Sequence, residues 1–278
     1  MKRLIATALT LSLAASLIAG CSSTDESKAP GETAQETATI TVGASVTPHS
    51  EILYQAQSIL AAEGITLNVV EIEDVVTPNT GVAEGTLDAN FFQHQPYLDD
   101  FNAENGTDLV SIGAVHYEPF GVYPGKTASL DELPEGAVVA VPNNVTNEAR
   151  ALLLLEQEGI IEVDDAAGIL ATVQDITSNP LNIEFVEVDP AQLVRTLPDV
   201  DIAVINGNYA LEGGLSIQDA IAVEAADGLA AQTYKNIVVT TADKANDPAL
   251  ARLVEVLQSQ EIQDYILNTY NGSVVPVQ

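Results

Sequence analysis

Residues 88–98, DANFFQHQPYL, join two different local patterns. The apolar and aromatic run that ends at Phe92 is typical of a short β-strand. Pro96, at the start of the next segment, is typical of the first turn of a helix. The stretch therefore predicts a strand that passes through a polar turn at His94 directly into a helix.

The same alternation of strand and helix patterns continues along the chain from Thr39. Short runs rich in β-branched residues predict strands at 40–44, 67–72, 109–115, 137–141, 183–188, 202–205 and 237–240. Helical patterns predict a helix that starts at Thr47-Pro48 and runs through Leu60, and further helices at 150–158, 248–258 and 261–270. Repeated strand–helix units indicate an α/β fold with largely parallel sheets covered by helices.

The length of this pattern favours two α/β lobes over one long sheet. We expect residues 39–120 and 241–278 to form lobe one, and residues 121–240 to form lobe two. The last two helices follow a strand that could be a return crossing, which would place the C-terminus on lobe one. Such an architecture leaves a cleft between its lobes, where α/β proteins tend to bind small molecules.

The first 20 residues have the features of a secretory signal peptide. Lys2 and Arg3 precede an apolar run that is too short to cross a bilayer comfortably and ends in small residues. The ending LIAGC, residues 17–21, is a bacterial lipobox, so cleavage would leave Cys21 as an acylated N-terminus. A free thiol or an intermolecular disulfide at Cys21 is the alternative. We therefore expect a lipoprotein anchored in the cell envelope on the extracytoplasmic side of a membrane.

Residues 21–38 comprise this cysteine and a segment rich in Ser, Thr, Glu and Gly, which predicts a flexible tether. The whole chain carries 40 acidic and 9 basic residues, for a net charge of −31. A nucleic-acid partner is improbable, because nothing supplies a basic patch. We interpret the acidity as a means of solubility outside the cell rather than as an acidic binding site.

An aromatic cluster is predicted around the turn at His94. Phe92, His94 and Tyr97 would form one wall of an apolar pocket with a polar tip, suited to a flexible apolar or thioether side chain. The alternative is that Phe92 and Tyr97 are ordinary core residues and His94 a turn residue with its hydrogen bonds satisfied.

Residues 141–155, VPNNVTNEARALLLL, predict the start of another helix. With Thr146 as N-cap, Asn147 and Arg150 lie in the first turn on one face. A cation there opposes the helix dipole, so the placement suggests a bound anion, and a planar guanidinium suits a carboxylate. We therefore expect removal of Arg150 to change fold stability little. The alternative is a surface arginine paired with Glu148 or another acid.

Two asparagines at strand ends are further candidates. Asn206 follows the predicted strand 202–205 and Asn236 precedes the strand 237–240, and either amide could bind a zwitterion without adding charge or serve only in a turn. The chain lacks the GxSxG, Walker, GxGxxG and HExxH motifs, so we expect no enzyme activity and no cofactor. His49, His94 and His116 lack metal-ligand spacing, which leaves zinc a minor possibility.

Four motifs together, DANFFQHQPYLDD, VPNNVTNEARALLLL, DIAVINGNYA and YKNIVVT, resemble the methionine-binding lipoprotein family of bacterial ABC importers. The resemblance runs from about Thr39 to Pro276. It implies a type II periplasmic-binding fold whose two lobes close on L-methionine or a close analogue. It also implies delivery of the ligand to a membrane permease driven by an ATPase subunit.

The resemblance also implies a role for each candidate residue. Phe92, His94 and Tyr97 would hold the ligand's side chain. Asn147 and Arg150 would bind its carboxylate, and Asn206 and Asn236 would help to fix its α-amino end. The family often has a tyrosine at the position of Val75. The ligand could therefore also be another amino acid, a methionine-containing dipeptide or the D-enantiomer. A metal-binding surface lipoprotein is a further alternative.

Overall fold

The computed structural model describes residues 37–225 and 229–277. The predicted signal peptide, Cys21 and nearly all of the predicted tether lie outside the described residues. Within the described part of the chain, no helix has the length and apolar character needed to cross a membrane.

Two separate sheets organise the described residues. The first has six strands in the order β13-β4-β12-β3-β1-β2. These strands are β1 (Ala38–Ala44), β2 (Ile65–Glu71), β3 (Ala89–His94), β4 (Val110–Tyr117), β12 (Lys235–Thr240) and β13 (Val275–Pro276). The helices around it are α1 (Glu51–Ala62), α2 (Thr77–Ala83), α3 (Gln95–Asn105), α8 (Pro248–Leu257) and α9 (Gln260–Tyr270).

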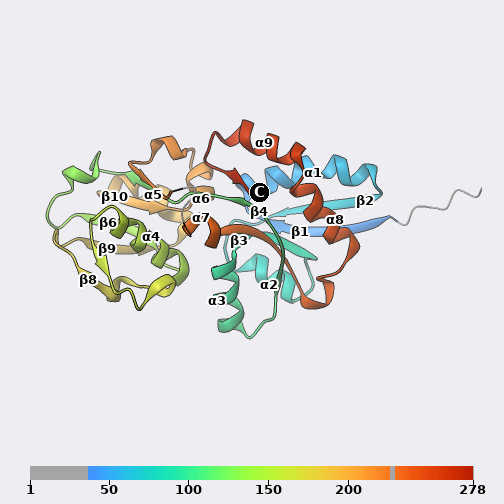
Figure 1. Ribbon diagram of the computed structural model, residues 1–278, viewed down its shortest axis with the longest axis horizontal. Coiled ribbons are helices and arrows are strands. Elements are labelled where there is room, and N and C mark those ends of the chain that lie inside the picture. Colours follow the sequence, from blue (N-terminus) through green and yellow to red (C-terminus); the bar gives the residue numbers. More distant parts are fainter. Residues whose placement is uncertain (1–36, 226–228, 278) are drawn as a thin grey trace, which may run out of the picture. The chain divides into compact units, whose positions relative to one another are not determined.

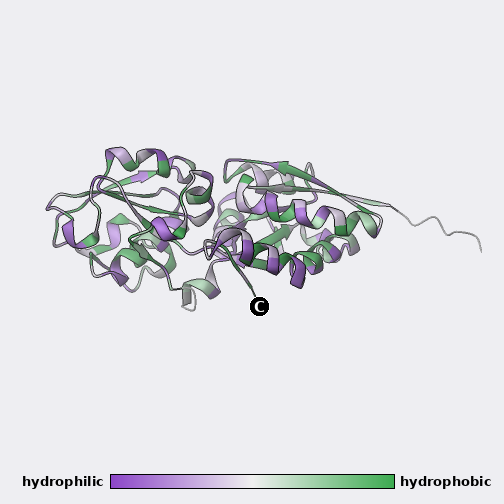
Figure 2. Ribbon diagram, turned by 90° about the horizontal axis from the view of Figure 1, so that it is seen from above, coloured by the Kyte–Doolittle hydropathy of each residue, from purple (hydrophilic) through white to green (hydrophobic). Residues whose placement is uncertain are grey.

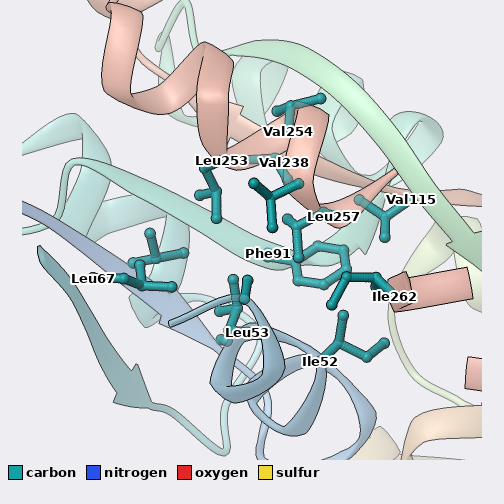
Figure 3. Close-up of a cluster of buried hydrophobic side chains, with 14 of the residues drawn as sticks. Ile52, Leu53, Leu67, Phe91, Val115, Val238, Leu253, Val254, Leu257 and Ile262 are labelled. Atoms are coloured by element: carbon teal, nitrogen blue, oxygen red, sulfur yellow. The ribbon is translucent and has the colours of Figure 1, made fainter. Parts of the chain in front are cut away.

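Helices cover both faces of the six-stranded sheet (Figure 1). On one face, α1, α8 and α9 pack against the strands around Phe91, and Figure 3 shows this core from Leu67 to Ile262. On the other face, α2 and α3 contribute Val82, Leu98 and Phe101 to a smaller core. The helices carry hydrophobic and hydrophilic residues in alternation, as expected when one side of each packs on a sheet (Figure 2).

The second sheet has five strands in the order β11-β5-β10-β6-β9. They are β5 (Gly121–Pro124), β6 (Val138–Pro142), β9 (Glu184–Val188), β10 (Ile202–Ile205) and β11 (Ala222–Val223), with a separate hairpin of β7 (Glu162–Val163) and β8 (Ile176–Ser178). The core around Leu152 of α4 (Val145–Gln157) lies on one face. The core around Leu193 of α5 (Leu193–Thr196) and Tyr209 of α6 (Gly207–Glu212) lies on the other.

Short helical segments complete the described structure. They are α7 (Leu229–Thr233), η1 (Val46–Ser50), η2 (Leu130–Glu132), η3 (Gly168–Leu170), η4 (Val173–Asp175), η5 (Pro190–Gln192), η6 (Leu197–Asp199), η7 (Ile217–Asp219) and η8 (Ala242–Lys244). The α-helix predicted from Thr47-Pro48 begins later, at Glu51, because Thr47 has extended backbone angles and breaks the preceding turn. The helix predicted at 150–158 begins earlier, at Val145, and the other predicted strands and helices are found with small shifts of their ends.

The sheets are mixed rather than largely parallel. β1 pairs in parallel with β2 and β3, and β6 pairs in parallel with β9 and β10. In contrast, β12 runs antiparallel to both β3 and β4, and β5 runs antiparallel to β10 and β11. The chain reaches β5 and β12 directly from the other sheet and not through a helix packed on the same sheet. The preference for parallel pairing in strand–helix–strand units therefore does not apply to these two strands.

The chain passes between the sheets twice. Residues 118–120, the first crossing, join β4 to β5, and residues 224–234, the second crossing, join β11 to β12. The predicted boundary of lobe two at residue 240 is therefore too late, because β12 pairs with β3 and β4 of the first sheet. As expected, α8, α9 and the C-terminal β13 return to the first sheet.

Candidate functional site

A pocket that is partly open to solvent lies between the two sheets. It is lined by residues of the first sheet, of the first crossing and of helices α4 and α6 on the second sheet. The lining residues are Val75, Phe92, Gln93, His94, Tyr97, Glu118, Asn147, Arg150, Asn206, Gly207, Asn208, Tyr209 and Asn236. The structure thus brings all seven residues singled out from the sequence to one place.

The aromatic part of the pocket comes from the end of β3 and the start of α3. The rings of Phe92 and Tyr97 meet edge to face with 5.9 Å between centroids. Tyr97 donates a hydrogen bond from its hydroxyl to the carbonyl oxygen of Val75 at 2.9 Å. Val75 packs against the core around Tyr209, so this position contributes an aliphatic side chain to the contact between the two sheets.

His94 has a defined hydrogen-bonding role. It is the N-cap of α3, and its Nδ1 accepts a hydrogen bond from the backbone N–H of Tyr97 at 3.2 Å. The ring proton must then lie on Nε2, which donates to Oδ1 of Asn147 at 3.0 Å. Burial, with the nearby charge of Arg150, lowers the pKa of His94 to about 4. A neutral histidine therefore links the first sheet to α4 of the second.

Helix α4 starts earlier than the sequence predicts. Asn144, not Thr146, is its N-cap, and the Asn144 side chain accepts from the N–H of Asn147. Asn147 therefore lies in the first turn, whereas Arg150 lies in the second, where the helix dipole acts more weakly. The helix dipole therefore gives no reason for an anion beside Arg150.

Arg150 is buried and already has a carboxylate partner. Its Nε and Nη2 donate to Glu224 at 2.6–3.1 Å, and Nη2 also donates to the carbonyl oxygen of Glu118 at 2.8 Å. The alternative of a surface pair with Glu148 is wrong, because the Glu148 side chain accepts from the N–H of Val173 instead. The hydrogen bonds found among the described residues use Nε and Nη2 of Arg150 but not Nη1, and Arg150 is one of the residues that line the pocket.

The ion pair shifts the pKa values of both partners. Burial alone would lower the pKa of Arg150, but the charge and hydrogen bonds of Glu224 outweigh burial and raise it. Burial alone would raise the pKa of Glu224, but Arg150, the N–H of Phe120 and the hydroxyl of Tyr117 together lower it. Both side chains are therefore charged at neutral pH.

A second buried carboxylate, Glu118, faces the pocket directly. His116 lies within 2.6 Å of its Oε1, and His49 lies 3.5 Å from the same atom. Burial raises the pKa of Glu118, although the charges of His49 and Arg150 oppose the shift. Gly207 lies so close that a Cβ atom there would be 2.8 Å from Cβ of Glu118, which explains a glycine at this position.

Sheet register places the polar groups around Glu118 in one row. Asn236 of β12 lies opposite His94 of β3 and opposite His116 of β4. Its Oδ1 lies 2.9 Å from Nε2 of His49. Asn206 donates to Oδ1 of Asn147 at 3.0 Å, while its own Oδ1 is buried with no hydrogen-bond partner among the described residues.

His49, His116 and Glu118 have candidate ligand atoms within 4.8 Å of one another, but they do not fit a metal centre. A metal-binding histidine usually donates its second ring N–H to an acceptor. In the described structure, Nδ1 of His49 and Nδ1 of His116 are buried without any partner. The protons are better placed on Nε2, where His116 donates to Glu118 and His49 donates to Asn236. The histidines thus hold two pocket groups in place.

The sequence reasoning missed two charged residues of this region, Glu118 and Glu224. Glu118 follows a predicted strand directly, between Tyr117 and a proline, and that position could have marked it. Glu224 has no such signal, because it is one acid among 40 and its partner lies 74 residues away. The two other arginines of the described residues lie outside the site: Arg195 is exposed, and Arg252 forms ion pairs near the surface.

Comparison with known proteins places the chain among bacterial binding lipoproteins. The family model described as NlpA lipoprotein matches residues 40–278. A methionine-binding lipoprotein of Bacillus subtilis is 40% identical over 86% of this chain and 88% of its own. A nutrient-binding protein of Burkholderia cenocepacia, solved bound to methionine, is 42% identical, covers 86% and 100% of the two chains, and has a TM-score of 0.82.

An ABC transporter periplasmic substrate-binding protein of Coxiella burnetii is 39% identical, covers 86% and 100% of the two chains, and has a TM-score of 0.81. These likenesses confirm the predicted α/β periplasmic-binding fold. The matched region contains both sheets and every residue of the pocket. The chain belongs to the NlpA lipoprotein family.

Proposed function

We propose that this protein is a lipid-anchored, extracytoplasmic solute-binding protein that captures L-methionine and delivers it to the permease of an ABC importer. The observation that carries the proposal is one pocket that joins an aromatic wall to a polar end containing a buried arginine and a buried glutamate. A free amino acid with an apolar side chain matches both parts, because its side chain suits the aromatic wall and its charged α-amino and α-carboxylate groups suit the polar end. No covalent step is needed for capture or release.

The aromatic wall suits the thioether. Phe92 and Tyr97 meet edge to face at an interplanar angle of 80°, so together they form an aromatic surface against which a sulfur atom can pack. His94 is neutral and bonded to Asn147, so it adds a flat surface without a charge beside the side chain. Val75 leaves this end of the pocket lined by an aliphatic group.

The polar end suits the zwitterion. Nη1 of Arg150 and the amide N–H groups of Asn147 are the donors placed to bind the α-carboxylate. Glu118 and the unpartnered Oδ1 of Asn206 are the acceptors placed to bind the α-ammonium group. Asn236 also lines the pocket, and its side-chain amide bonds His49, which lies next to Glu118.

Transport requires that ligand binding change the protein's shape. We propose that each sheet with its helices acts as one lobe and that the two crossings serve as the hinge. Ligand that contacts both lobes favours the closed state, and the closed state docks on the permease. The bond from His94 of one sheet to Asn147 of the other supports this division, since it joins the lobes across the pocket.

Methionine should bind more tightly than norleucine or leucine. The sulfur gains contacts with the rings of Phe92 and Tyr97 worth about 0.3–1.5 kcal/mol that a methylene group does not make. Calorimetric titration of the purified protein with the three amino acids measures the difference. Equal affinities for methionine and norleucine would remove the argument from sulfur, and tighter binding of a methionine-containing dipeptide would identify a larger ligand.

Replacement of Cys21 by serine should release the protein from membranes. The serine variant cannot be acylated at this position, so it lacks the proposed lipid anchor. Fractionation of cells, with a salt wash of the membranes, measures the distribution. Methionine binding by the released protein should equal that of the wild type, and a serine variant that still sediments with washed membranes would contradict the assignment of Cys21.

A further inference from the structure

Both crossings between the sheets converge on the guanidinium of Arg150. The first crossing supplies the carbonyl oxygen of Glu118, which accepts from Nη2 at 2.8 Å. The second crossing begins with Glu224, whose carboxylate accepts from Nε and Nη2. A side chain from α4 of the second sheet thus ties together the two segments on which any motion between the sheets depends.

Glu224 also joins the two crossings without Arg150. Its Oε2 accepts from the backbone N–H of Phe120 at 3.0 Å and from the hydroxyl of Tyr117 at 2.7 Å. Tyr117 ends β4 and Phe120 precedes β5, so both belong to the path of the first crossing. Glu224 is buried, and every neighbour named here is a donor, which is the environment that holds a carboxylate in one position.

Aromatic rings fix the guanidinium from either side. Its central carbon lies 4.3 Å from the centroid of Phe120 in the first crossing and 4.4 Å from the centroid of Tyr234 in the second. The plane of Arg150 is therefore set by one ring from each crossing. With Nε and Nη2 already bonded, only the Nη1 edge is left to face a ligand in the pocket.

We propose that Glu224 is a positioning residue for ligand binding. It holds Arg150 against both crossings, so that Nη1 is the nitrogen of the guanidinium that remains to bind the ligand's carboxylate. The role rests on the proposed function as an amino-acid-binding protein. It makes recognition of the carboxylate depend on the relative position of the two crossings. Arg150 then takes part both in ligand binding at the pocket and in the contact between the two crossings at the hinge.

The negative charge of Glu224 also keeps the guanidinium of Arg150 away from the carboxylate of Glu118. Glu118 is the other buried carboxylate near Arg150, and it faces the pocket. Without a negative charge at Glu224, the guanidinium would turn toward Glu118 and occupy the group that is placed to bind the ligand's ammonium. Both ends of the ligand would then lose their partners.

The test is Glu224→Gln, because glutamine keeps an acceptor for Phe120, Tyr117 and Nη2 while it removes the charge and places an N–H group against Nε. Glu148→Gln is the matched control, since Glu148 is also buried and lies on the same helix as Arg150, but bonds Val173 instead of a crossing. Tyr117→Phe is a milder second variant that removes one donor to Glu224. Calorimetry with L-methionine and with L-methioninamide, which lacks the carboxylate, is run on each variant and on the wild type.

In the wild type, methionine should bind at least about tenfold more tightly than methioninamide. In Glu224→Gln, methionine affinity should fall by at least about tenfold and the ratio of the two affinities should approach one. Tyr117→Phe should lower the ratio by about threefold, and Glu148→Gln should leave it unchanged. These results would support the role of Glu224.

A role in stability alone would weaken both ligands equally and leave the ratio in Glu224→Gln at the wild-type value, and that result would overturn the inference. A wild type that binds methionine and methioninamide equally well would also overturn it, while leaving methionine binding itself intact. A wild type that binds neither compound would overturn the proposed function and this role with it.

Discussion

Replacement of Arg150 by alanine is expected to lower the free energy of unfolding of the ligand-free protein by about 3–5 kcal/mol, because it leaves Glu224 buried without its counter-ion. The sequence alone predicts little change in stability, since it places Arg150 beside a ligand and not beside a carboxylate of the protein. Denaturant titration of the wild type and the variant measures the difference. A loss of less than about 1 kcal/mol, the value of an exposed pair, would contradict the buried pair.

The same substitution should weaken methionine binding by about 2–5 kcal/mol, because the ligand's carboxylate then enters the pocket without Nη1. The double variant Arg150→Met, Glu224→Gln separates the two effects. It removes both charges and retains an acceptor for Phe120 and Tyr117, so most of the lost stability should return. Binding should not return with it. Recovery of both would mean that Arg150 affects binding only through the fold.

Most of the architecture could be predicted from short-range patterns. The strand before His94 and the helix around Pro96 are present, because hydrophobic alternation and proline placement act within a few residues, but the predicted turn is not, since β3 runs to His94 and α3 begins at Gln95. The sheet that a strand joins depends on distant partners. The strand that contains Asn236 could therefore be predicted as a strand, while its pairing with β3 and β4 could not.

The candidate site divides in the same way. Phe92, His94 and Tyr97 are neighbours in sequence, and Asn147 and Arg150 share a helix face, so their grouping could be predicted. Glu118 and Glu224 reach Arg150 only through the two crossings, and their pairing is a consequence of how the sheets are joined. The sequence predicts that Arg150 binds the carboxylate of a ligand, whereas the carboxylate found beside it belongs to the protein.

Acidification should destabilise the ligand-free protein between about pH 6.5 and pH 4, because its three histidines are all buried and neutral. Burial lowers the pKa of His49 to about 4, that of His94 to about 4 and that of His116 to about 3. In this range the unfolded chain binds protons at these sites and the folded chain does not, so stability falls as the pH falls. Each proton contributes a slope of about 1.4 kcal/mol per pH unit.

Glu118, Glu148 and Glu212 act in the opposite direction and reduce the net slope, because burial raises their pKa values and lets the folded chain bind protons before the unfolded chain does. The variant His94→Gln isolates one histidine, since glutamine can still donate to Asn147. Denaturant titrations at pH 7.5, 6 and 5 should show a dependence flatter than that of the wild type by up to about 1.4 kcal/mol per pH unit, with the larger difference between pH 6 and pH 5. Glu84→Gln, which changes an exposed carboxylate, is the control. Identical pH dependence in His94→Gln and the wild type would mean that His94 takes up its proton without unfolding, and its bonds to Tyr97 and Asn147 would then not hold it neutral.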